Sequence, residues 1–456
     1  MCFALKRGEI GRRLDARYHL PVYRLRLLRL LEQYPDVRRL DNYANVFCGP
    51  FGTEITSADY QEAGVPMLRI SNITKEGTIN KNDLVFLTEE KAASLASTQV
   101  VPGDLVISQR GTLGMPAVVP DDFPFWNVSA NLVAINGLSE ISADFVQLYL
   151  SSSVGGSQVE RCQSGQVQGK ITTEDVASVL IPKVEDESNL IAAMGVARGA
   201  RQDTLARADA LLSRMDAYLL EQLSLVVPAE DGRQTYAVRL ADMLADRKVN
   251  ADFFHPERLI AIREQKARTG LRAERLSDIA DFIRGGVAAD ASQDYVGLAS
   301  VQSNTGELVL TNEEVGGQCF TFQKDDVLFA RLRPYLNKVH RAESGGLCSP
   351  EFHVIRLRPA KTGAEAVLPD YLATVLRSSL ILAQTRHMMT GNTHPRLANE
   401  DVTNLVVSIP KPAVQQTIVE ELRRRRQDAR RLRLQAEKDW AAAKAQFERR
   451  LLGGDV

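Results

Sequence analysis

The segment closest to a catalytic signature is a glycine-rich run, Gly165-Gln-Val-Gln-Gly-Lys-Ile-Thr172. A P-loop needs four residues between its glycines so that backbone N–H groups can surround the phosphates, and this run has three. Its counterpart later in the chain, which starts at Gly391, has Pro395 and Arg396 in place of the second glycine and the lysine. We therefore interpret the run as a structural turn.

Signatures of other catalytic centres are missing from the sequence. There is no Pro-Pro dipeptide, as an adenine methyltransferase loop would need, and no GxGxxG, GxSxG or HExxH motif. The histidines show no metal-ligand spacing and are predicted at surface or turn positions: His19, His255, His340, His353, His387 and His394. We expect no catalytic residue, no metal site and no cofactor bound by this chain. A PD-(D/E)xK nuclease motif is too short to decide from sequence, so an enzyme with an unrecognised active site stays open as the alternative.

Polar segments in both halves of the chain have side chains suited to reading DNA. Arginine and lysine contact phosphates and guanine edges, whereas asparagine and glutamine pair with adenine. The candidates in the first half are Gln109, Arg110, Thr112, Asn72, Lys75, Gln168 and Lys170. The candidates in the second half are Arg284, Gln302, Asn304, Arg331, Arg333, Tyr335, Asn337, Lys338, Asn392, His394 and Arg396. Solvated loops use the same residue types, so the prediction rests on equivalent positions in two similar halves.

The chain repeats itself with a period near half its length, which indicates a duplicated domain. Arg13-Leu-Asp-Ala-Arg-Tyr-His-Leu-Pro21 returns as Lys248-Val-Asn-Ala-Asp-Phe-Phe-His-Pro256. Gly103-Asp-Leu-Val-Ile-Ser108 returns as Asp325-Asp-Val-Leu-Phe-Ala330, and each run predicts a strand that leads into a polar segment. We expect Gln109, Arg110, Arg331 and Arg333, which follow these strands, to lie on a DNA-facing surface. Asn127–Val133 has a weaker echo in Leu347–His353.

The strongest echo closes each half. Ser164-Gly-Gln-Val-Gln-Gly-Lys-Ile-Thr-Thr-Glu-Asp-Val176 returns as Thr390-Gly-Asn-Thr-His-Pro-Arg-Leu-Ala-Asn-Glu-Asp-Val402. Ile181-Pro-Lys183 then returns as Ile409-Pro-Lys411. One such match could arise by chance, but several in the same order indicate two related domains.

A long helix is predicted after each Ile-Pro-Lys, over residues 188–225 and 413–452. Apolar side chains recur there at heptad or three- and four-residue steps: Leu205, Leu212, Met215, Leu219, Leu432, Ala436 and Phe447. A helix with one narrow apolar stripe needs a partner, so we expect the two helices to pair antiparallel. The first seam should then face Leu432, Ala436, Ala443 and Phe447. The alternative is that each helix packs on its own domain.

These elements give the expected organisation of the 456 residues. We predict a first domain over 1–186, a helix over 187–226, a second domain over 227–411 and a second helix over 412–456. Short apolar runs between glycine-rich turns predict an α+β fold for both domains. The net charge of −1 neither favours nor excludes nucleic acid. Five scattered cysteines and the lack of an 18-residue apolar run predict a soluble protein of the reducing cytoplasm.

In this ordered, duplicated set of segments the chain resembles the specificity subunits of type I restriction–modification systems. The resemblance is carried by Leu14-Asp-Ala-Arg-Tyr-His19, Gly103–Thr112, Asp326–Lys338 and the two Ile-Pro-Lys closures with their helices, and it covers nearly the whole length. One departure is Asp325-Asp326 where the first half has Gly-Asp. A second is the short polar linker around Leu225–Thr235, which blurs where one half ends.

The resemblance implies a non-catalytic protein whose two target-recognition domains each read half of an asymmetric, split DNA site. It also implies two methyltransferase subunits as partners, with restriction (translocase–nuclease) subunits joining for cleavage. S-adenosylmethionine, ATP and Mg would then be bound by those partners. A coiled-coil DNA-binding adaptor of another phage-defence complex is a further alternative.

Overall fold

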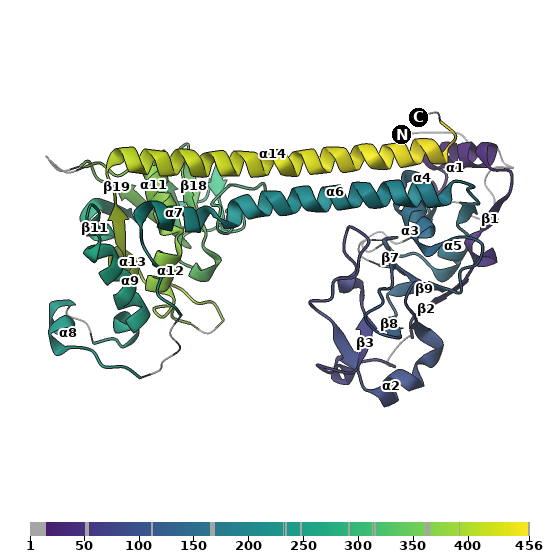
Figure 1. Ribbon diagram of the computed structural model, residues 1–456, viewed down its shortest axis with the longest axis horizontal. Helices are drawn as coiled ribbons and strands as arrows, with labels where there is room; N and C mark the ends of the chain where they lie inside the picture. Colours follow the sequence, from purple (N-terminus) through teal and green to yellow (C-terminus); the bar gives the residue numbers. More distant parts are fainter. Residues whose placement is uncertain are drawn as a thin grey trace. The chain divides into compact units, whose positions relative to one another are not determined.

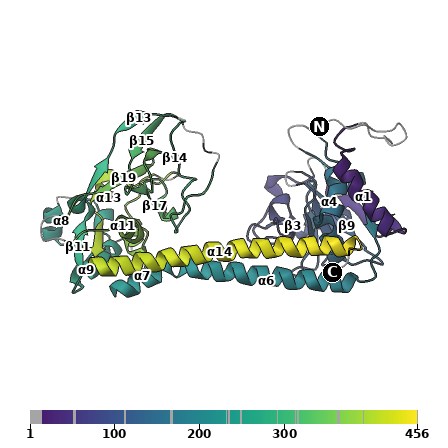
Figure 2. The same ribbon diagram turned by 90° about the horizontal axis from the view of Figure 1, so that it is seen from above.

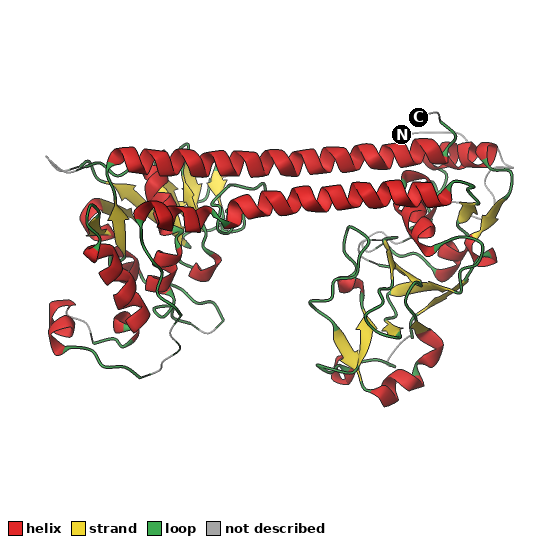
Figure 3. Cartoon of the chain, in the orientation of Figure 1, coloured by secondary structure: helices red, strands yellow, loops and turns green. Residues whose placement is uncertain are grey.

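The computed structural model describes residues 15–454 apart from short gaps at 51–53, 111–112, 165–168, 231, 233–234, 247–248, 291, 312, 314–315, 361–364 and 392. These residues form two compact units, each of which mixes helices and strands (Figure 3). Unit 1 comprises residues 1–202 and 436–456, and unit 2 comprises residues 203–435. The expected α+β character is thus present in both units.

The strands of unit 1 form three antiparallel or mixed sheets. A two-stranded sheet pairs β1 (Val37–Arg39) with β10 (Leu180–Pro182). A four-stranded sheet has the order β2 (Asn45–Cys48), β9 (Leu132–Asn136), β6 (Leu105–Ser108), β7 (Pro116–Val118). A second four-stranded sheet has the order β4 (Val85–Leu87), β3 (Val65–Leu68), β8 (Trp126–Val128), β5 (Gln99–Val100). Strand β6 is buried throughout because the sheet is covered on both faces.

Unit 2 repeats this arrangement. Its two-stranded sheet pairs β11 (Arg272–Arg275) with β20 (Val406–Ile409). Its first four-stranded sheet has the order β12 (Ala280–Ile283), β19 (Phe352–Leu357), β16 (Val327–Ala330), β17 (Val339–Arg341). Its second has the order β13 (Gly286–Ala288), β15 (Gln318–Phe322), β18 (Gly346–Cys348), β14 (Tyr295–Val296). The first two sheets match those of unit 1 strand for strand.

The third sheet differs between the units at its edges. Each third sheet contains one parallel pair, which is β3 with β8 in unit 1 and β14 with β18 in unit 2. In unit 1 the sheet continues beyond β3 to β4, whereas in unit 2 it continues beyond β15 to β13. The duplication is therefore exact for the two-stranded sheet and the first four-stranded sheet, and only approximate for the third sheet.

Short helices accompany the sheets (Figure 1). In unit 1 they are α1 (Pro21–Gln33), α2 (Glu89–Ser94), α3 (Ala143–Ser151), α4 (Ser153–Glu160) and α5 (Thr173–Ala177). In unit 2 they are α7 (Met215–Leu223), α8 (Leu240–Asp246), α9 (Pro256–Ala267), α10 (Leu276–Ile279), α11 (Pro369–Leu376), α12 (Ser379–Thr385) and α13 (Asn399–Thr403). Single 3-10 turns lie at Leu40–Asn42, Ser57–Asp59, Ile70–Asn72, Ala96–Thr98, Asp252–Phe254 and Pro334–Leu336. Pro21 opens α1 and Pro256 opens α9, each at a first helical position, where a missing N–H costs nothing.

Two long helices, α6 (Glu187–Ser213) and α14 (Pro412–Leu451), contribute residues to both units. Within unit 1, Arg201 pairs with Glu437 at 2.7 Å and Arg450 pairs with Asp186. Within unit 2, Arg433 pairs with Asp209 at 2.8 Å. In each unit the numbers rise along one helix as they fall along the other, so the segments run antiparallel (Figure 2).

Each unit takes the start of one long helix and the end of the other into its core. In unit 1, Leu190 and Met194 of α6 join Phe447 and Leu451 of α14 in one apolar cluster. In unit 2 an equivalent apolar cluster contains Ile418 and Leu422 of α14 together with Met215 and Leu219 of α7. Counted from the lysines of the two Ile-Pro-Lys closures, Leu190 corresponds to Ile418, Met194 to Leu422 and Leu219 to Phe447.

These clusters correct the expected seam. Leu219 packs with Ile418, Val419 and Leu422 in unit 2 rather than opposite Phe447, which packs in unit 1. An antiparallel pair places the end of one helix beside the start of the other, so the heptad positions match in reverse order. Leu212 lies against the unit 2 cluster, Leu205 and Leu432 are half-buried, and Ala436 is buried.

The first long helix is also interrupted. Residues 188–225 were expected as one helix, but α6 stops at Ser213 and α7 starts at Met215, with Arg214 at φ −87° and ψ 4° between them. The Arg214 carbonyl accepts from Tyr218 N–H at 3.1 Å within α7 and also from Arg425 Nη1 at 2.9 Å, so Arg425 links the break to α14. The break turns Met215 and Leu219 toward the core of unit 2. Among the described residues, no helix is long and apolar enough to cross a membrane.

Replacing Leu219 by alanine should lower the free energy of unfolding of unit 2 by about 2–5 kcal/mol, because the side chain is fully buried and leaves a cavity. Leu434→Ala, at a position 65% exposed on α14, should change it by less than about 0.5 kcal/mol. Hydrogen exchange of unit 2 peptides measures both. Equal effects would contradict the packing described here.

Candidate nucleic-acid interface

In each unit a polar segment follows the central buried strand and is held between two other segments. After β6, Gln109 N–H donates to the Asn131 carbonyl at 2.9 Å, and Ile171 N–H donates to the Gln109 carbonyl at 3.2 Å. After β16, Arg331 N–H donates to the Glu351 carbonyl at 2.9 Å, and Leu397 N–H donates to the Arg331 carbonyl at 3.0 Å. The backbone of this site is therefore repeated bond for bond.

The same geometry brings the closing segment of each half beside the strand end. Arg110 bridges to Lys170 in unit 1, and Leu332 bridges to Arg396 in unit 2. Ser164 and Thr390 complete the two turns by bridging to Lys170 and Arg396. Two basic segments that lie about 60 residues apart in the sequence thus become neighbours in each unit. This arrangement places Arg110 beside Lys170 in unit 1 and brings Arg396 next to the Arg331 segment in unit 2.

The unit 2 site contains an acid that the sequence analysis did not single out. Glu351 accepts from Arg396 Nη2 at 2.8 Å and Nε at about 3.1–3.2 Å, and its Oε2 lies 4.0 Å from Arg331 Nε. The hydrogen bonds from Arg396 hold the pKa of the Glu351 carboxyl below its ordinary value. Burial and the charge of Arg331 lower the pKa of neighbouring His353 to about 4, so this ring is neutral at pH 7. Glu351 stands opposite Asn131 when Asn127–Val133 is aligned with Leu347–His353. This alignment is the sequence signal that could have placed Glu351 at the site.

Most of the predicted DNA-reading side chains reach solvent. The exposed ones are Lys75, Arg110, Arg284, Asn304, Arg333, Tyr335 and His394. The half-buried ones are Lys170, Gln302, Arg331, Lys338 and Arg396. Arg333 adopts a left-handed backbone conformation, with φ 48°, and its N–H donates to the Pro395 carbonyl at 2.7 Å. Contact with DNA stays a prediction for these residues. Thr112, Gln168 and Asn392 lie outside the described residues.

Three predicted DNA-reading residues are buried, which corrects the expected surface positions. Gln109 is only 3% exposed because its segment is covered on both sides. Asn72 braces its own loop: its Nδ2 donates to the Asp83 and Asn80 carbonyls, and its Oδ1 accepts from Arg69 N–H. Asn337 Nδ2 donates to the Arg377 carbonyl at 2.7 Å. An amide whose donors are used inside the protein has none left for a base edge.

Two other candidates support the same loop of unit 2. Asn337 Nδ2 also donates to Asn304 Oδ1 at 3.1 Å, and Lys338 Nζ donates to the Leu298 carbonyl at 2.6 Å. Gln302 Oε1 accepts from the Thr305 hydroxyl at 3.0 Å. Sequence patterns do not separate such internal braces from exposed readers, since both use asparagine, glutamine and lysine.

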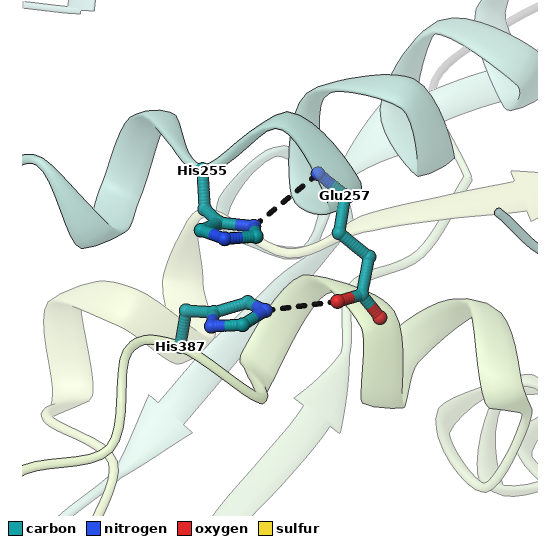
Figure 4. A group of neighbouring side chains, drawn as sticks. All are labelled: His255, Glu257 and His387. Atoms are coloured by element: carbon teal, nitrogen blue, oxygen red, sulfur yellow. Dashed lines mark hydrogen bonds and ion pairs between the residues drawn. The ribbon is translucent and has the colours of Figure 1, made fainter. Parts of the chain in front are cut away.

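The structure also gathers His255, Glu257 and His387, which the sequence spacing did not connect (Figure 4). Glu257 Oε2 accepts from His387 Nε2 at 2.8 Å, and Oε1 accepts from Arg386 Nη1 at 2.5 Å. His255 Nδ1 accepts from Glu257 N–H at 3.3 Å, at the start of α9. Their ligand atoms lie within 4.8 Å of one another, close enough to share a metal ion.

The geometry of this group suits an ion pair better than a metal centre. The two imidazole rings are stacked with centroids 3.4 Å apart and an interplanar angle of 16°. Their nitrogen lone pairs lie in nearly parallel planes, so they do not converge on one ion. The Glu257 carboxylate is also already occupied by Arg386 and His387. In its present form the group fastens the start of α9 to the end of α12.

Sequence comparison gives no relatives for the chain: no family model matches it, and no curated protein does. Solved structures do match. One is a chain from work on complex assembly and conformational transition of the type I R-M system, with a TM-score of 0.52 and 16% identity, covering 91% of this chain and 96% of that one.

Two further structures align over similar lengths. The S subunit of a type I restriction-modification system from M. genitalium has a TM-score of 0.41 and 12% identity, over 91% of this chain and 95% of its own. The HsdS subunit from Thermoanaerobacter tengcongensis has a TM-score of 0.36 and 17% identity, over 93% and 94%.

The match at a TM-score of 0.52 spans nearly the whole length of both chains, so the protein has the fold of a type I restriction–modification component. The resemblance inferred from the duplicated segments is thereby confirmed at the level of the fold.

Replacing Glu257 by glutamine should lower the free energy of unfolding by about 1.5–3 kcal/mol, because the buried carboxylate accepts two charge-assisted hydrogen bonds. Glu174→Gln is the matched control, since its bond to Arg39 is solvent-exposed and should contribute less than about 1 kcal/mol. Urea unfolding followed by circular dichroism compares them. A larger loss in the control would contradict the structural role of Glu257.

Proposed function

We propose that the chain is the DNA-recognition subunit of a type I restriction–modification complex and has no catalytic site of its own. The observation that supports this most is the repeated site beside β6 and β16, where a basic closing segment crosses the strand end with the same backbone bonds in both units. Arginine-rich loops on a rigid sheet are suited to contacting phosphates and base edges. The fold shared with a type I R-M structure agrees with this function.

Each unit would read one half of a split target, and the two halves would differ. Unit 1 offers Arg110 and Lys170 at the site, whereas unit 2 offers Arg333 with the Arg331–Glu351–Arg396 group. An acid fixed between two arginines limits how those arginines can meet a base. Since the side chains differ on a common backbone, the half-sites should have different sequences.

The long helices would set the distance between the half-sites. In this proposal α6 and α14 pair antiparallel as a coiled coil that relates two recognition domains by a pseudo-twofold axis. The ion pairs within each unit, Arg201 with Glu437 and Arg433 with Asp209, support such a pairing. Readers of two half-sites align on one face of DNA when they lie about 34–36 Å apart, or one helical turn.

The chemistry of modification would belong to partners. Two methyltransferase subunits would supply S-adenosylmethionine, and restriction subunits, where present, would supply ATP and Mg for translocation and cleavage. The complex would act in the cytoplasm. The chain described here would contribute sequence selection and a docking frame.

The function is tested by methyl transfer to double-stranded DNA from labelled S-adenosylmethionine. The chain alone should give no signal above a no-protein control, and addition of the cognate methyltransferase subunit should produce transfer at one bipartite sequence. Transfer by the isolated chain would instead identify it as a self-contained enzyme. A partnered complex that methylates without sequence preference would remove the proposed role in recognition.

Arg110→Ala and Arg333→Ala should each weaken specific DNA binding by about 1–3 kcal/mol and relax the preference within one half-site only, a different one for each variant. Both side chains are exposed, so the fold should be preserved. Arg430→Ala, at an exposed position of α14, serves as a control for simple loss of charge. Selection from a randomised duplex library gives the readout. Relaxation of the same half-site by both variants would count against one site per unit.

A further inference from the structure

Unit 2 contains a partly open cavity of about 440 Å³ beside its long-helix segments. Its walls come from the loop at 302–305, helices α11 and α12, the α6–α7 break and α14. One wall is apolar and consists of Leu212, Met215, Leu219, Leu382 and Leu422. The opposite wall is polar and contains hydroxyl and guanidinium groups. Pockets of this size and mixed lining are typical of small-molecule sites.

Arg377, in the polar wall, is a buried cation. It is 9% exposed, and its guanidinium donates to the Val339 carbonyl at 2.7 Å and to the Thr374 hydroxyl at 3.4 Å. Within the described part of the chain it forms no ion pair. Burial, and then the charge of Arg426, lower the pKa of the Arg377 guanidinium to about 9, against an ordinary value above 12. The folded protein therefore holds this charge at a cost.

A second cation, Arg426 of α14, lines the same cavity. Its Nε is buried with no hydrogen-bond partner among the described residues, and burial lowers the pKa of its guanidinium. No described carboxylate lies within ion-pair distance of it. Asp370 and Glu307 favour the charged forms of both arginines, but Asp370 is bonded to Arg423 and lies 3.8 Å from Arg341.

The other charged groups of the cavity are already paired. Arg433 bonds Asp209 at 2.8 Å, and Asp216 accepts from Ser379 N–H at 3.0 Å and from the Ser379 hydroxyl at 2.6 Å. Three arginines and two aspartates line the space, which leaves an excess of positive charge. Asp216 keeps its charge because its partner is a serine, so the excess is one positive charge, and Arg377 and Arg426 are the two lining cations that form no ion pair among the described residues.

The duplication shows that the fold does not need Arg377. Ser153 is bonded to Glu448 in unit 1 as Ser379 is bonded to Asp216 in unit 2, through both backbone N–H and hydroxyl. Counting back from these serines, Ser151 stands where unit 2 has Arg377. Unit 1 thus builds the same helix junction with a small neutral residue, so the arginine serves something other than packing.

We propose that this cavity binds a small phosphomonoester, with its phosphate between Arg377 and Arg426 and its organic part against the apolar wall. A phosphate monoester carries about two negative charges at pH 7 and several acceptor oxygens, which match two guanidinium groups on separate elements. A carboxylate carries only one charge. The cavity of about 440 Å³ is also far larger than one water molecule, which takes about 30 Å³, so it has room for an organic group in addition to a phosphate.

A phosphate could also come from a DNA strand. Arg377 is only 9% exposed, which leaves little of its side chain for a duplex backbone to contact. A free small molecule is therefore the proposed ligand. Gln302, Asn304 and Asn337 line this cavity as well, but the proposed function rests on the backbone site at Gln109 and Arg331, so failure of nucleotide binding would leave that function untouched.

The test is titration calorimetry of the full chain with adenosine 5′-monophosphate, inorganic phosphate and acetate. The nucleotide should bind saturably with a dissociation constant below about 1 mM, inorganic phosphate at least ten-fold more weakly, and acetate not measurably. Absence of nucleotide binding would overturn the proposal. Equal binding of inorganic phosphate would overturn the role of the apolar wall, and equal binding of acetate would overturn the phosphate assignment.

Variants locate the site. Arg377→Gln and Arg426→Gln should each weaken nucleotide binding at least ten-fold, and Arg426→Gln carries the test if the Arg377 variant does not fold. Arg198→Gln is the matched control, because Arg198 stands at the position of Arg426 when residues are counted from the Ile-Pro-Lys closure of unit 1. It should bind like the unaltered chain. Unchanged binding in folded Arg426→Gln, or displacement of the nucleotide by a short duplex without terminal phosphates, would overturn the proposal.

Discussion

The contact on which the rest of the structure depends is the joint packing of two helix ends in the core of each unit. Leu190 and Met194 meet Phe447 and Leu451 in unit 1, and Ile418 and Leu422 meet Met215 and Leu219 in unit 2. A helix as long as α14, with charged residues on most of its surface, does not hide its apolar stripe alone. Burial of both ends also ties the sheets of unit 1, which end at Pro182, to a segment of α14 more than 200 residues further along the chain.

A polar contact accompanies this packing in both units. Glu448 and Asp216 accept hydrogen bonds from Ser153 and Ser379, where one short helix gives way to the next. The bonds fix how the long helix lies on the short pair, since carboxylate, N–H and hydroxyl must all align. The repeat has kept this kind of bond with acids at different positions, since Glu448 lies 37 residues after Lys411 and Asp216 lies 33 residues after Lys183. It has not kept the neighbouring residue, which is Ser151 in one unit and Arg377 in the other.

The candidate DNA-reading site likewise has the same backbone bonds in both units but different side chains. Backbone bonds at Gln109 and Arg331 are equivalent, whereas the side chains beside them differ in charge, length and pairing. A frame held by main-chain hydrogen bonds tolerates such changes, because the bonds do not depend on side-chain identity. This is consistent with a fold that persists at 16% identity to a solved type I R-M structure.

The sequence by itself determined the duplication, the α+β character, the long helices and the strands that lead into the polar segments, because these depend on local periodicity and on ordered echoes along the chain. The tertiary structure decided the order of the helix seam and the break at Arg214, since antiparallel pairing and the cores of the two units set them. It also decided that Gln109 is buried, that Asn72 and Asn337 are internal braces, and that His255, Glu257 and His387 meet. A polar residue type does not reveal whether its partner is water, backbone or a distant side chain, because that depends on what the fold brings beside it.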